Sequence, residues 1–364
     1  MGKTKAVQLQ KNKKSYVSYI MIPVLFVVIQ ILYRTEILNS YWYQILQLAC
    51  INGIVAMSLN LINGMTGQFS LGQAGFMSVG AYTSAMLTKL VFQPAMGNPF
   101  ASYGLFFLAL LIGAAVAAFI GFLIGIPSLR LKGDYLAIIT LGFSEIIRVL
   151  WRVFPFSGRA KGLNGIQKLS TFPIIFVAVI IVMILLRNFT KSRYGRGCIA
   201  IRENELAAET MGINTTKAKI KSFVFSAFIA GLGGGLYAHL MMFINPEMFS
   251  QVKSTDMLLF LYAGGVGSYS SALLGALIFT MLPEFLRFMG EWRLVIYALI
   301  LIIIMLNRPK GIFGKHEFGF MRFGEKESIH QKADNGGLIS SFTQRRKAKK
   351  LAQASNAGKD AGKQ

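Results

Sequence analysis

Charged residues are scarce in this sequence, and that scarcity argues against an ordinary soluble domain. Only 15% of the 364 residues are Asp, Glu, Lys or Arg, whereas a typical soluble domain has about 25%. Apolar residues make up 54% of the chain and stand in long uninterrupted runs. Runs of about 20 apolar residues match the roughly 30 Å hydrocarbon core of a bilayer. The sequence therefore predicts an all-α, polytopic transmembrane helix bundle.

Residues for redox, metal or nucleophilic chemistry are also few. The chain has two cysteines and three histidines. Cys50 lies in an apolar run and Cys198 in a basic segment, so we expect two different environments and no disulfide. The sequence contains no Cys/His metal spacing, no nucleophile–base arrangement and no Gly-x-x-x-x-Gly-Lys-Ser/Thr loop. A membrane enzyme is therefore a weak hypothesis, and we expect no cofactor or nucleotide in this chain.

Ten apolar segments are candidates for crossing the membrane. The first, residues 16–33, resembles a secretory signal but has 18 residues and no cleavage pattern, so we expect a retained span. The eighth, residues 255–266, is too short to cross as a straight helix, and its exit Ala263–Gly267 is glycine-rich. We expect about eight to ten membrane segments, some broken or re-entrant. The candidates are residues 16–33, 42–62, 70–90, 103–126, 135–154, 171–186, 223–244, 255–266, 270–288 and 292–306.

Basic residues cluster in three places and predict the orientation of the chain. Residues 1–15 hold five Lys and no acid, residues 187–221 hold eight Lys or Arg against three acids, and residues 315–364 hold eleven against five. Such clusters beside membrane spans mark the cytoplasmic side and contact anionic lipids. We therefore expect a basic cytoplasmic N-terminus (1–15), a transmembrane domain (16–314) containing a cytoplasmic loop (187–222), and a polar cytoplasmic tail (315–364). A nucleic-acid-binding tail at Arg345–Lys347 is the weaker interpretation, and no nucleic-acid partner is expected.

One loop disagrees with this orientation. Residues 155–170 carry Arg159, Lys161 and Lys168 without an acid, yet they fall outside if the N-terminus is inside. Moving this loop inside would place the more basic residues 187–221 outside, so we keep the scheme.

Two segments are candidates for the transport path. The run Asn60–Tyr82 is rich in Gly, which permits close helix packing or a discontinuous helix. Either it is a packing seam with a turn, or Ser70 and Gln73 line a path near a helix start. In the second segment, Asp134 is placed to cap a helix, and Glu145 and Arg148 stand three residues apart on one face of it. That pair is either a structural ion pair or part of a polar patch on the path.

Two further segments indicate helix contacts. The stretch Arg202–Met211 favours a short cytoplasmic helix, with Gly212 as its C-cap. Its adjacent alanines suit a groove on a partner, although a plain connector has the same composition. In the span 223–244, a small-residue face predicts close helix packing, and His239 is expected to be a packing residue. That face consists of Ala227, Gly231, Gly234 and Gly235.

Four ordered motifs together resemble the branched-chain amino-acid ABC permeases, and the LivM-type subunits in particular. In that family the cytoplasmic loop corresponds to a coupling helix that contacts ATPase subunits. The general importer motif there is Glu-Ala-Ala, three more residues and Gly. Here Ala207, Ala208 and Gly212 match, while Leu206 replaces the Glu and Glu205 stands one place earlier. The four motifs, spread over about residues 40–314, are Asn60–Tyr82, Gly133–Arg148, Arg202–Asn214 and Leu306–Gly311.

The resemblance implies a permease subunit of an ATP-driven importer in the bacterial inner membrane. It implies a homologous LivH-type permease, two cytosolic ATPases (LivG- and LivF-type) that bind ATP and Mg, and an external solute-binding protein. It also implies that Glu205, Ala207, Ala208 and Gly212 form the coupling site. Permeases for urea or short-chain amides are close relatives, so the substrate stays open at this point. A passive channel or ion-coupled carrier is the hypothesis from a different class.

Overall fold

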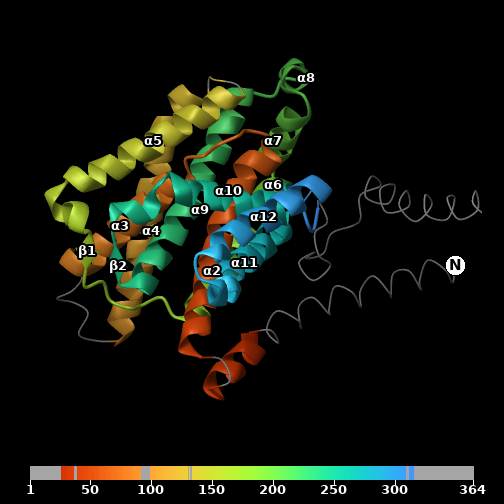
Figure 1. Ribbon diagram of the computed structural model, residues 1–364. Coiled ribbons are helices and arrows are strands. Elements are labelled where there is room, and N and C mark those ends of the chain that lie inside the picture. The colour runs from red at the N-terminus through yellow and green to blue at the C-terminus, as the bar shows by residue number, and fades with distance from the viewer. Residues whose placement is uncertain are drawn as a thin grey trace, which may run out of the picture. The chain divides into compact units, whose positions relative to one another are not determined.

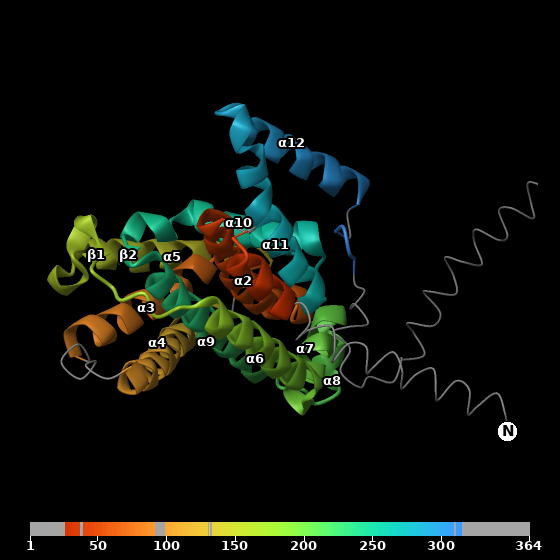
Figure 2. The ribbon, with the colours of Figure 1, turned by 90° about the horizontal axis from the view of Figure 1, so that it is seen from below.

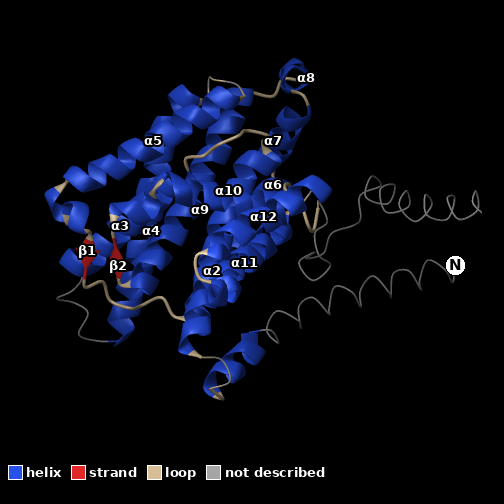
Figure 3. Cartoon of the chain, in the orientation of Figure 1, coloured by secondary structure: helices blue, strands red, loops and turns tan. Residues whose placement is uncertain are grey.

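The computed structural model describes residues 26–36, 39–91, 99–129, 131, 133–308 and 311–314, and these lie within one compact unit. The described part is almost entirely helical, as predicted (Figures 1 and 3). The predicted N-terminal segment 1–15 and tail 315–364 lie outside the described residues, as does the first part of the span 16–33. The helices are α2 (Ser40–Asn60), α3 (Gln73–Met86), α4 (Pro99–Ser128), α5 (Asp134–Val153), α6 (Phe172–Lys191), α7 (Arg193–Glu203), α8 (Glu205–Thr210), α9 (Thr215–Met241), α10 (Gln251–Gly264), α11 (Tyr269–Phe285) and α12 (Trp292–Asn307).

Shorter elements complete the described chain. Residues 26–34 are helical, and α2 and α3 each end in a π-helical turn. Two short strands pair antiparallel, with Leu163 opposite Ile244. These elements are the π-helices η1 (Leu61–Met65) and η2 (Leu87–Val91), the 3-10 helices η4 (Pro155–Ser157), η5 (Arg159–Lys161), η6 (Pro246–Phe249) and η7 (Leu286–Met289), and the strands β1 (Leu163–Asn164) and β2 (Phe243–Ile244).

Five described helices are long and apolar enough to cross a membrane, which agrees with a multi-pass bundle. Helix α12 is apolar but shorter. Helices α5 and α10 lie outside this set: α5 carries four charged residues, and α10 has only 14 residues. The five are Ser40–Met65, Ser102–Ser128, Phe172–Lys191, Thr215–Met241 and Tyr269–Met289.

The predicted small-residue face of α9 is a close-packing seam. A Cβ atom on Gly231 would lie 2.6 Å from the Cβ of Ala117 in α4, and one on Gly234 would lie 1.9 Å from the Met77 carbonyl oxygen in α3. Glycine is required at both positions because the neighbouring backbones leave no room for a side chain. His239, on the same helix, is fully buried. It forms hydrogen bonds with the Thr88 hydroxyl and the Gly235 carbonyl, so it is a packing residue as predicted.

The two ends of the bundle are distinct in both ribbon views. Helices α7 and α8 lie at one end, and β1 and β2 lie at the other (Figures 1 and 2). The β1–β2 pairing places residues 155–170 at the same end as the segment after α9. Residues 155–170, the loop whose basic charge disagreed with the predicted orientation, therefore lie at the opposite end of the bundle from α7 and α8. The predicted alternation of spans requires this arrangement.

Three local predictions can be compared with the backbone. Helix α10 ends at Gly264 and is followed by Gly265 and Gly267 with φ of +139° and +91°, which confirms a short helix with a glycine exit. The predicted capping role of Asp134 is wrong. Gly133 is the N-cap of α5 and Asp134 is its first helical residue, where its carboxylate still favours the positive helix end. Cys50 of α2 and Cys198 of α7 are both free and buried.

Candidate functional site: a helical hook and two polar clusters

Residues 193–212 form two helices joined by a single extended residue, and we call α7 and α8 together the hook. The predicted single helix from Arg202 to Met211 is wrong, because Asn204 has φ −161° and ψ 111° and interrupts it. The Asn204 Oδ1 atom accepts a hydrogen bond of 3.1 Å from the Ala207 backbone N–H. Asn is a favoured N-cap because its side chain satisfies an orphan donor of the first turn. The sequence thus starts a new helix at Glu205.

Gly212 closes the hook in the way that the sequence predicted. It has φ +80°, one residue beyond the C-cap Met211. Its N–H donates to the Glu209 carbonyl at 2.9 Å, and the Ile213 N–H donates to the Ala208 carbonyl at 3.0 Å. These two bonds form a Schellman motif, which needs a residue in the left-handed region and therefore favours glycine.

Two of the predicted coupling residues fix the hook to the bundle. The Glu205 carboxylate accepts a hydrogen bond of 2.6 Å from Lys219 Nζ of α9, whose side chain is 8% exposed. Ala208 is 4% exposed and packs with Cys198, Ile201 and Ala218. Burial raises the pKa of the Cys198 thiol, so that group stays neutral in this small core. Ala208 therefore faces inward, whereas the deep-contact interpretation of the adjacent alanines would place it on the surface.

The exposed surface of the hook includes an apolar part, beside the exposed Glu203 and Glu209. Leu206 is 69% exposed and Met211 is 82% exposed, and Ala207 is exposed beside Leu206. From the sequence, Leu206 is a departure from the family motif and Met211 has no assigned role. The signal was nevertheless present, because large apolar side chains in a charged segment have no reason to face water.

Arg202 joins the hook to a segment that is distant in the sequence. Its Nη1 atom donates to the Gly64 carbonyl oxygen at 2.8 Å, and Nη2 donates to Glu203 at 2.6 Å. Gly64 lies in η1, at the end of the apolar helix that begins at Ser40. The Gly267 N–H, in the turn between α10 and α11, donates to Asn60 Oδ1 at 2.9 Å beside it. This contact of Arg202 was not predicted from the sequence.

Ser70 and Gln73 are buried within the helix bundle of this chain. Gln73 is the first residue of α3 and is fully buried. Its Nε2 atom donates to Ser58 at 2.5 Å and to Ser226 at 3.0 Å, whereas its Oε1 atom finds no donor among the described residues. Ser70 is also fully buried, and its N–H donates to Asn63 at 3.3 Å. Gln73 thus links α2, α3 and α9 at a helix start as predicted, and Ser70 lies in the segment just before it.

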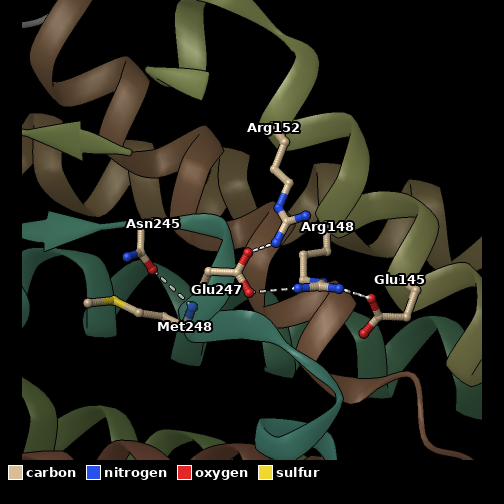
Figure 4. Close-up of polar contacts among 6 residues, drawn as sticks. All are labelled: Glu145, Arg148, Arg152, Asn245, Glu247 and Met248. Carbon is tan, nitrogen blue, oxygen red and sulfur yellow. Dashed lines mark hydrogen bonds and ion pairs between the residues drawn. The ribbon is translucent and has the colours of Figure 1, made fainter. Parts of the chain in front are cut away.

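Glu145 and Arg148 form the predicted ion pair and extend it. Arg148 Nη2 lies 2.5 Å from Glu145, and Arg148 Nη1 lies 2.8 Å from Glu247 of η6 (Figure 4). Arg152 pairs with the same Glu247 carboxylate (Figure 4). The Arg148 and Glu145 side chains are 19% and 28% exposed. The cluster therefore ties α5 to the segment after α9, a link that sequence analysis missed because Glu247 is 99 residues from Arg148.

The structure keeps the predicted residues in three groups. Glu205, Ala207, Ala208 and Gly212 come together in the hook, whereas Ser70 with Gln73 and Glu145 with Arg148 form two separate clusters. In the part of the chain that the structure describes, no group of three or more His, Cys, Asp or Glu is placed to hold a metal ion.

Sequence comparisons with known proteins place the chain in a family. Residues 41–305 match the family model described as the permease component of the branched-chain amino acid transport system. The high-affinity branched-chain amino acid transport system permease protein LivM of Escherichia coli is 31% identical over 295 residues, which cover 71% of this chain and 67% of that protein. Its Salmonella typhimurium counterpart is 30% identical over the same shares. A probable LivM of Methanocaldococcus jannaschii is 22% identical over 72% of this chain and 80% of that protein. No solved structure gives a significant match.

Proposed function

The chain belongs to the branched-chain amino acid transport system permease family, and we propose that it is the LivM-type permease subunit of an ATP-driven importer of branched-chain amino acids. The match over residues 41–305 carries this proposal, because it includes both the apolar helices and the hook. LivM proteins are high-affinity branched-chain amino acid permeases by name. A homologous LivH-type permease completes the pathway, in keeping with the 31% identity to LivH over 150 residues.

The hook is the site at which two cytosolic ATPases, of the LivG and LivF type, act on the permeases. Its exposed Leu206, Ala207 and Met211 offer an apolar surface to a groove, while Glu205 and Ala208 hold the hook rigidly on the bundle. ATP and Mg bind to those partners rather than to this chain. A rigid attachment is required because a movement of the ATPases can act on the permease only through a contact that does not bend.

The translocation path lies on the face formed by α5 and α10. Helix α4 exposes Phe107, Leu111 and Phe119 and has no charged residue, which suits lipid. Helix α5, by contrast, carries the partly exposed Glu145 and Arg148, and α10 lies next to it. Ionisable groups in a membrane region face protein or a water-filled cavity. The partner permease therefore covers this face, and the buried cluster of Ser70 and Gln73 stands behind it.

The hook end of the bundle faces the cytoplasm of a bacterial cell, and the β1–β2 end faces the solute-binding protein. The basic residues of 187–221 support this orientation, and with it both termini are cytoplasmic in the inner membrane.

A competition experiment with the complete subunit set tests the substrate. Proteoliposomes that contain both permeases and both ATPases, with the binding protein outside and ATP inside, are supplied with labelled leucine, urea or acetamide. Leucine is expected to accumulate, and unlabelled isoleucine and valine are expected to compete with it. Accumulation of urea or acetamide without leucine would overturn the proposed substrate while leaving the permease assignment intact.

A further inference from the structure

Lys253 places an ammonium group in the interior of the bundle. Its Nζ atom donates to Asn52 Oδ1 at 3.1 Å and lies 5.6 Å from the centroid of the Tyr237 ring. Asn52 is 2% exposed and stands near the midpoint of the apolar helix Ser40–Met65. Lys253 is therefore an intramembrane charge, at a depth where charged side chains are rare and usually functional.

The surroundings of this ammonium group offer it few hydrogen-bond acceptors. An ammonium has three N–H donors, and Asn52 is the one acceptor within hydrogen-bond distance in the described chain. The Asn52 amide is itself held by its Nδ2 donation to Thr280 at 3.0 Å. A partly buried cation with a single neutral acceptor is poorly compensated, so an anionic group from outside this chain would stabilise it.

The Asp256 carboxylate lies one helical turn from Lys253 but forms no salt bridge with it. Asp256 follows Lys253 by three residues on α10, so the two share a helix face. Their charges act on each other, yet no ion pair within 4.0 Å joins them in the described chain. Glu145 and Arg148 have the same spacing and do close, at 2.5 Å. Among the described residues, neither Lys253 nor Asp256 therefore has a salt-bridge partner.

Both side chains are within reach of the proposed path. Lys253 and Asp256 are half-buried, and the α10 positions beside them, Val252 and Thr255, are exposed. Helix α10 borders the face that we assign to the partner permease. We infer that a solute moving along that face can reach both charges, because neither side chain is fully buried.

We propose that Lys253 and Asp256 bind the two charged groups of a zwitterionic amino acid during its passage. The Lys253 ammonium donates to the substrate carboxylate, and the Asp256 carboxylate accepts from the substrate ammonium. The substrate's two charged groups are attached to one carbon, so they fit two side chains one turn apart. This inference rests on the proposed function and adds a recognition site within the membrane to it.

A paired neutral substitution separates recognition from a structural role. Replacing both residues with neutral residues of similar size removes two partly desolvated charges together, so the fold should tolerate the change. We expect Lys253→Met with Asp256→Asn to assemble and to retain ATPase activity stimulated by the binding protein. Leucine uptake in proteoliposomes should fall on the order of 100-fold, since two desolvated charge contacts to the substrate are lost.

A charge exchange and a control pair complete the test. Lys253→Asp with Asp256→Lys keeps one charge of each sign on α10 but exchanges their positions, so uptake should stay low. Glu284→Gln with Arg287→Met neutralises a pair of the same spacing on α11 and η7, and uptake should remain near wild type. Wild-type uptake by the neutral or the exchanged variant would overturn the recognition site. A wild-type complex without ATP-driven leucine uptake would instead overturn the proposed function.

Discussion

Arg202 of the hook donates a hydrogen bond of 2.8 Å to the Gly64 carbonyl oxygen at the end of the first long apolar helix. Gly64 lies in a π-helical turn, whose carbonyl groups are offset from the regular α-helical ladder. Gly67, in the left-handed region with φ +73°, brings the backbone so close that a Cβ atom would lie 2.7 Å from Arg202 Cγ. The Arg202 side chain is therefore held tightly between the hook and the end of this apolar helix. A movement of the hook would be transmitted to the helix through this contact.

Replacing Arg202 should uncouple ATP hydrolysis from transport. In Arg202→Ala the hook keeps its Glu205–Lys219 bond and still binds the ATPases, but its link to η1 is lost. We expect the number of leucine molecules imported per ATP to fall several-fold, with partial recovery in Arg202→Lys because one donor remains. The ratio is measured in proteoliposomes from parallel uptake and phosphate-release assays. A parallel fall in both rates at an unchanged ratio would contradict this role.

The apolar surface of the hook should be needed for ATPase binding. A charge at Leu206 or Met211 would have to be desolvated in the partner's groove, so Leu206→Asp with Met211→Asp should cost about 2–5 kcal/mol of association. We expect little ATPase to co-purify with this variant in detergent. Thr216→Asp, at an exposed position early in α9, is the matched control and should keep the ATPases. Equal co-purification in both variants would show that the hook is a plain connector.

Gly212 should tolerate Asn better than Ala, and Pro not at all. Its φ of +80° costs about 1–2 kcal/mol for an ordinary L-residue, and Asn adopts this region more readily. Proline has a fixed negative φ and lacks the N–H that donates to Glu209, so Gly212→Pro should unravel the end of α8. Limited proteolysis of the hook should become faster in the order Gly, Asn, Ala, Pro. Equal cleavage of all four proteins would contradict the Schellman geometry.

Ala208 should reject a bulky side chain for reasons of packing. It lies against Cys198, Ile201 and Ala218, and Ala208→Phe would overfill that core at a cost of about 1–3 kcal/mol. Ala207→Phe, one residue away and exposed, should leave the thermal unfolding temperature unchanged. The comparison is made by thermal unfolding in detergent. The reverse order would show that Ala208, rather than Ala207, faces the partner.

Loss of Glu247 should destabilise the α5 attachment more than loss of Glu145. Glu247 pairs with both Arg148 and Arg152, whereas Glu145 pairs with Arg148 (Figure 4). Because these side chains are partly exposed, we expect only about 1 kcal/mol for Glu247→Gln and less for Glu145→Gln. Thermal unfolding in low salt is the suitable measurement. Larger destabilisation by Glu145→Gln would mean that Glu247 is incidental to the cluster.

Features that depend on short sequence separation were predictable. The apolar runs, the glycine exit of α10, the Gly212 cap and the Glu145–Arg148 pair each follow from periodicity or spacing along one element. The small-residue face of α9 was readable for the same reason, since all its members lie on one helix.

Features that join distant segments were not predictable from one sequence. Nothing near Arg202 indicates Gly64, which is 138 residues away, and nothing near Arg148 indicates Glu247. The inward direction of Ala208 depends on Asn204, which breaks the expected helix and rotates the second half of the hook. An Asn within a helix-forming stretch is compatible with either state until tertiary contacts decide.

The most direct measurement is leucine accumulation in ATP-loaded proteoliposomes, compared for this chain with its partner permease alone, for the complete complex, and for the complex with the Leu206→Asp/Met211→Asp hook. The account predicts accumulation against a gradient by the complete wild-type complex and none by the other two. Leucine movement at the full rate without ATPases, or with the altered hook, would contradict the claim that this bundle is driven through the hook by a separate ATPase.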